Sequence, residues 1–172
     1  AEAVQDTVVG NGTAASCDGN ALEAAVSGGG TVTFACGAAP ATILANTMVL
    51  DGVNTIIEGG GLVTISGEGL RQIFIVNAGA SLTLRDLTVS DGLWGGGGGA
   101  IDNSGTLNLQ GVGNNAGGIK GNVANTGTIN SGAKIDGDLD NDGTANLAGE
   151  ITGNLDNSTN DLTLTGNLKV GA

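Results

Sequence analysis

Histidine and tyrosine are absent from the chain, proline occurs once, and aromatic residues make up only 2% of the 172 positions. The lack of histidine removes the side chain that most often serves as a general base. Only five lysine and arginine residues stand against 17 acidic ones, and the net charge of −12 argues against nucleic acid or an anionic membrane as a partner. No apolar run is long enough to span a bilayer, so membrane insertion is not expected.

Glycine is abundant, with 34 residues, and it separates short runs rich in β-branched and apolar side chains. Those runs include TVTF, NTII, LVTIS, IFIV and SLTL. Runs of this kind between glycines are typical of short strands joined by turns. Long stretches with helical periodicity are missing, so the sequence predicts an all-β protein.

An internal repeat of 16 residues is the strongest signal in the chain. Its three copies read IKGNVANTGTINSGAK, IDGDLDNDGTANLAGE and ITGNLDNSTNDLTLTGN, with one added residue in the third. Four columns align, namely Ile119, Ile135 and Ile151, then Gly121, Gly137 and Gly153, then Val123, Leu139 and Leu155, and finally Asn125, Asn141 and Asn157. A weaker copy precedes them at NSGTLNL.

Sixteen residues fit one turn of a β-solenoid, in which two or three short strands are separated by tight bends. Successive coils would stack about 4.8 Å apart, with apolar columns inside, an asparagine ladder, and glycine at the bends. We expect a single domain over residues 1–172. Residues 1–30 would form a tail and cap, residues 31–118 irregular coils of roughly 20 to 25 residues, and residues 119–172 regular 16-residue coils.

The segment NALEAAV predicts a short helix that covers the N-terminal end of the solenoid. Asn20 is the candidate N-cap, and Glu23 follows at the spacing of a capping box. Cys17 and Cys36 are expected to form a disulfide that ties this helix to the first strands, with two buried free thiols as the alternative. No cap is predicted near the C-terminus, where strand-like sequence continues through DLTLTGNLKV, so an exposed strand edge is expected there.

Four segments within about residues 7–110 carry a family resemblance. They read TVVGNGTAASCDGNALEAAVSGGGTVTFACG, NTIIEGGGLVTISGEG, IFIVNAGASLTLRDLTVSDG and GGGGGAIDNSGTLNL. The chain here resembles the right-handed parallel β-helix repeat proteins of bacterial cell surfaces, many of which open with a short helix before a TVTF-like strand. The resemblance implies a right-handed parallel β-helix outside the cell and no single activity. From Ile119 onward the regular coils depart from it.

Catalysis is not expected from the residues present. A calcium-dependent polysaccharide lyase needs acidic metal ligands and a base, and a glycosidase needs two carboxylates across a cleft. Arg85 and Asp86 are adjacent, so in a strand they would point to opposite faces. Phe34 and Phe74 lie in apolar runs typical of a core. Trp94, in the loop GLWGGGGG, either covers the solenoid wall or contacts a partner.

The stretch DLDNDG has the opening pattern of a calcium-binding loop, with Asp138, Asp140 and Asp142 two residues apart. The sixth residue after Gly143 is Gly149, however, where such a loop requires a glutamate. Strand periodicity instead turns all three aspartates outward. We expect an acidic outer stripe, with peripheral calcium as the alternative, and no other metal or cofactor.

The sequence predicts a secreted or cell-surface structural protein without enzymatic activity. With one end capped and the other open, head-to-tail stacking of copies into a filament or surface layer is the leading hypothesis. The tail AEAVQDTVV, whose start is typical of a mature chain, could add a strand to the next subunit. The alternatives are an adhesin or carbohydrate-binding module that uses outer ladders or Trp94, and a polysaccharide lyase or hydrolase. Asn11 and Asn157 match the glycosylation sequon, which a chain rich in asparagine and threonine also produces by chance.

Overall fold

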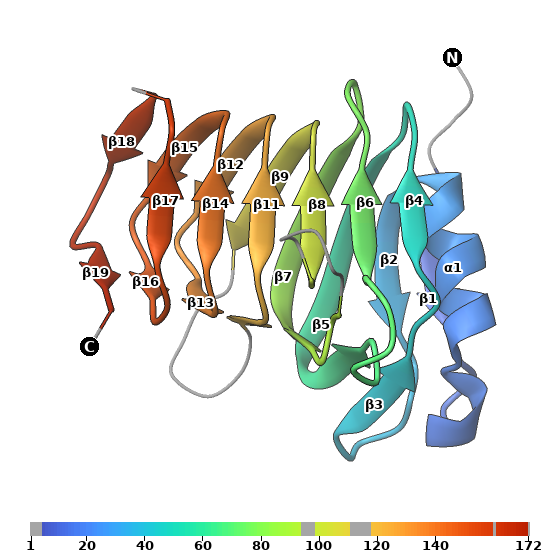
Figure 1. The fold of residues 1–172 in the computed structure, drawn as a ribbon. Helices are drawn as coiled ribbons and strands as arrows, with labels where there is room; N and C mark the ends of the chain where they lie inside the picture. Colours follow the sequence, from blue (N-terminus) through green and yellow to red (C-terminus); the bar gives the residue numbers. More distant parts are fainter. Residues whose placement is uncertain (1–4, 94–98, 111–117, 160, 172) are drawn as a thin grey trace.

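The computed structural model describes residues 5–93, 99–110, 118–159 and 161–171. Within these ranges the chain forms one α-helix, a short 3-10 helix (η1, Ala14–Ser16) and 19 strands, most of them short. The strands pair in parallel, and the chain winds through them as a solenoid (Figure 1). In Figure 1 the front strands run upward while the chain advances to the left and crosses to the back at the top, which is a right-handed winding. The predicted all-β solenoid with a short N-terminal helix is confirmed.

The solenoid has three faces, numbered here in the order in which a regular coil visits them. The first face contains β3 (Ala41–Leu44), β10 (Gly118–Lys120), β13 (Lys134–Asp136), β16 (Glu150–Ile151) and β19 (Lys169–Val170). The second face contains β4 (Met48–Leu50), β6 (Phe74–Val76), β8 (Ile101–Asn103), β11 (Val123–Asn125), β14 (Leu139–Asn141) and β17 (Leu155–Asn157). The third face contains β1 (Thr7–Val9), β2 (Gly30–Phe34), β9 (Thr106–Gln110), β12 (Thr128–Ser131), β15 (Thr144–Leu147) and β18 (Leu162–Leu164). Two long strands, β5 (Asn54–Ser66) and β7 (Ser81–Ser90), bend and belong to both the third and the first face.

Strand pairing in the last coils follows the repeat seen in the sequence. Lys134 pairs with Glu150, 16 positions further on. Ala145 pairs with Leu162 at a distance of 17 positions, so the added residue of the third copy falls between β17 and β18. The last step, from Glu150 to Lys169, takes 19 positions. Earlier coils are longer, and successive paired positions on the second face lie 26, 27 and 22 residues apart.

Columns of residues in register, nearly all of them apolar, fill the interior. One column on the third face runs through Val32, Ile57, Leu84, Leu109, Ser131 and Leu147. One column on the first face runs through Ile43, Ile65, Val89, Ile119, Ile135 and Ile151. All of these residues are buried. Burial of each aliphatic side chain contributes about 1.5–3 kcal/mol, so every coil is stabilised mainly by the coils before and after it.

The predicted asparagine ladder lies on the inner side of the second face and includes one rung more than the repeat. Nδ2 of Asn103 donates to Oδ1 of Asn125, and Nδ2 of Asn125 donates to Oδ1 of Asn141, each at 2.6 Å. Asn141 donates in turn to Asn157. The ladder begins at Asn103 because Val76 occupies the preceding rung, and Oδ1 of Asn103 is consequently buried without a partner in the described residues.

Glycine is required at the bend between the second and third faces. A Cβ atom on Gly143 would overlap the carbonyl oxygen of Gly127, and one on Gly127 would overlap that of Gly105. The backbones of successive coils approach so closely here that a Cβ atom at either glycine would force the neighbouring coil to shift. The glycines of the repeat therefore set the tight corner on which the short coil depends.

Helix α1 (Gly19–Gly28) covers the N-terminal end of the core, as the sequence predicts (Figure 1). Its buried side chains are Leu22, Ala25 and Val26. The disulfide between Cys17 and Cys36 is confirmed, and it links the entry of α1 to the end of β2. The cap and the first coils are therefore one cross-linked unit.

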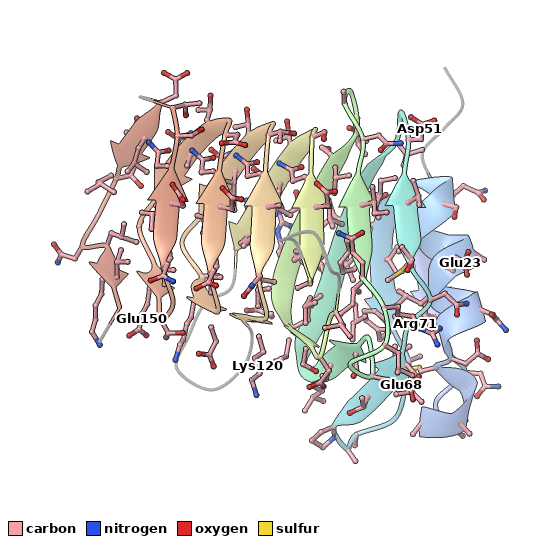
Figure 2. All side chains as sticks on the ribbon, in the orientation of Figure 1. Glu23, Asp51, Glu68, Arg71, Lys120 and Glu150 are labelled. Atoms are coloured by element: carbon pink, nitrogen blue, oxygen red, sulfur yellow. A yellow bond between two sulfur atoms is a disulfide. The ribbon has the colours of Figure 1, made fainter. Side chains whose placement is uncertain are left out.

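The prediction of Asn20 as N-cap was wrong. Asp18 is the N-cap, and its side chain accepts a hydrogen bond from the backbone N–H three residues further on, at 2.8 Å. Asn20 and Glu23 instead both accept hydrogen bonds from Nδ2 of Asn46, and Oδ1 of Asn46 accepts one from Arg71. Figure 2 labels Glu23 on α1 and Arg71 on the neighbouring coil. The capping-box spacing was misleading because these side chains bind the adjacent coil rather than their own helix.

Candidate functional site

The last described strand on each face is β17, β18 or β19. In the described part of the chain, β17, β18 and β19 each pair with a single neighbouring strand. They lie at the opposite end of the molecule from α1 (Figure 1). Their outer edges present backbone N–H and C=O groups that can pair with another strand.

Two apolar side chains are exposed at this C-terminal end. Leu164 continues the buried column that includes Leu147, and Val170 continues the column that includes Ile151. The exposed fraction rises from 1% at Leu147 to 57% at Leu164, and from 2% at Ile151 to 42% at Val170. Positions that form the core in each earlier coil therefore face solvent here. Neither residue was singled out from the sequence, although the column alignment would have found both.

The other end of the third face is also an open edge. Among the described residues, strand β1 pairs with β2 alone, through Thr7 with Val32 and Val9 with Phe34. Residues 7–9 of the N-terminal tail, which was predicted to add to a neighbouring subunit, thus pair within their own chain. Because all strands of the third face are parallel, β1 and β18 run in the same direction at its two edges. Pairing of β18 with β1 of another molecule would continue the same parallel sheet.

The acidic stripe, formed by Asp138, Asp140 and Asp142, faces outward as predicted. Asp140 and Asp142 are exposed, and Asp138 is half-buried. Asp138 contacts both neighbouring coils, because its backbone N–H donates to Oδ1 of Asn122 at 3.0 Å and its Oδ1 accepts from the backbone N–H of Asn154 at 2.7 Å. Asp138 thus holds three coils in register.

The aspartates of the acidic stripe share no hydrogen-bond partner among the described residues. Asp140 pairs in register with Ala124 and Asp156, and Asp142 accepts a hydrogen bond from the hydroxyl of Ser158. Among the described residues, no group of three or more histidine, cysteine or acidic side chains is placed to hold a metal ion. Peripheral calcium at the stripe stays a prediction.

Glu150 lies between two lysines on the outer side of the first face. Its Oε1 accepts a hydrogen bond from Nζ of Lys169 at 3.0 Å, and its Oε2 lies 3.8 Å from Nζ of Lys134. The hydrogen bond and the charge of Lys169 hold the pKa of Glu150 below its usual value. The contacts are solvent-exposed, so their contribution to stability is small, but they connect the last three described strands of this face. Figure 2 labels Glu150.

The other residues considered from the sequence do not gather into a catalytic site. Phe74 is fully buried and Phe34 packs against the core, as predicted. Arg85 forms an ion pair with a glutamate of the preceding coil at 2.8 Å, and Asp86 occupies a bend with φ of 48°. Trp94 lies outside the described residues. The second sequon residue, Asn157, is half-buried in the ladder, whereas Asn11 is exposed.

Comparisons of the chain with models of known families, with curated proteins and with solved structures found no match. Within the described residues, no helix has the length and apolar character needed to cross a membrane. The fold therefore defines the class, a parallel β-solenoid, and the function has to be argued from the ends and faces of the molecule.

Proposed function

We propose that the protein is a non-enzymatic structural solenoid that assembles head to tail through its C-terminal end. The observation that carries this proposal is the exposure of Leu164 and Val170 in columns that are buried throughout the preceding coils. A second copy that places its β1 edge against β18 would pair unsatisfied backbone groups and cover part of this apolar surface. The contact joins two different surfaces, so it repeats without closing and produces a filament.

The N-terminal side also supports such a contact. Apolar side chains are exposed on the terminal strand of each face, namely Val8 on β1, Leu44 on β3 and Val49 on β4. Their exposed fractions are 61%, 54% and 49%. Helix α1 covers the core at this end, and among the described residues no second strand pairs with β1. Both ends thus combine unpaired strand edges with apolar side chains, as a surface that binds another copy requires.

Sedimentation velocity over a series of concentrations, followed by negative-stain microscopy, tests the proposal. The wild-type chain should form polymers whose length grows with concentration. The double variant Leu164→Lys/Val170→Lys should remain monomeric, because each copy would have to bury two charges at the contact. Leu70→Lys is the matched control, since Leu70 is 70% exposed in a bend away from the C-terminal edge.

A wild-type chain that stays monomeric at high concentration would refute head-to-tail assembly. Equal loss of assembly in the Leu70→Lys control would also count against it, because the effect would then come from added charge in general. Circular dichroism of all variants shows whether the solenoid is still folded.

The proposal includes export from the cell. The disulfide between Cys17 and Cys36 is the kind of cross-link that persists in oxidising compartments, and the resemblance to bacterial surface β-helix proteins points to the same location. Protease treatment of intact cells of the source organism should remove the protein, while a cytosolic marker should survive. Survival of the protein together with the marker would contradict an external location.

A further inference from the structure

A second row of asparagines lies on the outer side of the third face. It consists of Asn108, Asn130 and Asn146, which are in register on β9, β12 and β15. Nδ2 of Asn146 donates to Oδ1 of Asn130, and Nδ2 of Asn130 donates to Oδ1 of Asn108, both at 2.8 Å. Nδ2 of Asn108 donates to Oγ1 of Thr83 at 3.2 Å. The chain of hydrogen bonds fixes the orientation of every amide in this outer asparagine row.

The outer asparagine row keeps unused hydrogen-bonding capacity. An amide offers two N–H donors and two lone pairs, and the ladder uses one of each at Asn130. Beside the row run the half-buried residues Thr106, Thr128 and Thr144, also in register. Their hydroxyls have no hydrogen-bond partner within the described part of the chain. The third face therefore presents oriented amides and free hydroxyls in columns, repeated at about 4.8 Å.

A groove of about 400 Å³ follows the outer asparagine row. Gly132 and Ala148 occupy the positions next to Asn130 and Asn146 on the same strand side, and their small size leaves the groove open. Gln110 and Thr165 extend it at its two ends. None of the described residues that line the groove has an ionisable side chain. Its volume lies within the range of small-molecule sites in proteins.

We propose that this groove binds a linear, uncharged glycan that lies along the solenoid axis. A hydroxyl-rich polymer matches the amides that line the groove and the threonine hydroxyls beside it, and a regular polymer matches donors and acceptors repeated from coil to coil. Three rungs span about 10 Å, or roughly two sugar units. The absence of cations in the lining and the net charge of −12 disfavour anionic glycans. The inference goes beyond assembly, because the groove follows the third face rather than either end.

Titration calorimetry tests the groove, with cellohexaose, xylohexaose and mannohexaose as neutral probes and hexagalacturonate as the anionic comparison. The monomeric Leu164→Lys/Val170→Lys background keeps failure of binding distinct from failure of assembly. The blocking variant is Gly132→Leu, since an added Cβ at Gly132 meets no atom within 4 Å and its backbone needs no glycine conformation. Gly28→Leu, at an equally open position on α1, is the control.

At least one neutral hexasaccharide should bind at millimolar concentration or below. Gly132→Leu should weaken that binding at least about tenfold, equivalent to about 1.4 kcal/mol, while Gly28→Leu should bind as the parent does. Stronger binding of hexagalacturonate, or equal binding by Gly132→Leu, would overturn the proposal. Absence of binding by all three neutral hexasaccharides would also overturn it. If the protein then depressed the freezing point, the threonine and asparagine columns would be assigned to an ice surface instead.

Discussion

The inner asparagine ladder allows a quantitative prediction of stability. Removing the amide of Asn125 and removing that of Asn103 leave different numbers of buried oxygen atoms without a hydrogen-bond donor. Asn125 is 1% exposed and sits in the middle of the ladder, where it accepts from Asn103 and donates to Asn141. Replacing it with alanine leaves Oδ1 of Asn141 buried without a donor. The unpartnered Oδ1 of Asn103 also stays, so the number of buried orphan acceptors rises by one.

Asn103→Ala has a different result, although it removes the same atoms from an equally buried site. It deletes the existing orphan acceptor and creates a new one on Asn125, so the number is unchanged. An orphaned buried acceptor costs about 1–3 kcal/mol, and the two cavities are alike. Asn125→Ala should therefore be less stable than Asn103→Ala by about 1–3 kcal/mol.

Urea unfolding followed by circular dichroism measures both free energies of unfolding on the same chain. The comparison is made in the monomeric background, so that assembly does not add to stability. Equal free energies for the two variants would refute the reasoning, because the ladder would then act only by filling space. Val76→Asn extends the test, since a donor in that rung would face the orphan acceptor of Asn103.

Four further outcomes are expected. Replacing Cys17 and Cys36 with serine should lower the free energy of unfolding by about 3 kcal/mol in urea titrations, because the disulfide closes a loop of 19 positions; no change would show that the cap holds without it. The pKa of Glu150 is lowered in the folded state, so its contact with Lys169 is stabilising above the usual glutamate pKa. Protection of the β19 amides against hydrogen exchange should therefore persist at those pH values and fall as pH drops through the lowered pKa. Protection that does not depend on pH would contradict the contact between Glu150 and Lys169. Gly143→Ala should destabilise the fold by about 1–3 kcal/mol through overlap with the preceding coil, whereas Gly132→Ala should be tolerated. A chelator should leave the melting temperature unchanged if the acidic stripe is only solvated, and a drop would identify bound calcium there.

The repeat was readable from the sequence because a solenoid applies the same packing constraint in every coil. Ile135 and Leu139 had to match Ile119 and Val123, since the residues stack directly on one another. The asparagine column was found for the same reason. The register of residues 119–164 could therefore be predicted from the sequence, whereas the 19-position step from Glu150 to Lys169 could not.

Contacts between coils of unequal length were not predictable. Asn20 and Glu23 have the spacing of a capping box, but their partner is Asn46, in a different coil. No local pattern in the sequence indicates that these side chains contact Asn46. The groove on the third face was missed for a related reason: it depends on Gly132 and Ala148 lying one above the other, and each is unremarkable when read alone.

The shared register also makes the coil an interchangeable unit of length. Because Ile119, Ile135 and Ile151 occupy one position in successive coils, removal of residues 135–150 would bring β10 beside β16 with the interior columns intact. Each such coil extends the molecule by about 4.8 Å. Gain or loss of one repeat in the gene would thus change the length of the protein along the solenoid axis by a fixed step, while its cross-section stayed the same.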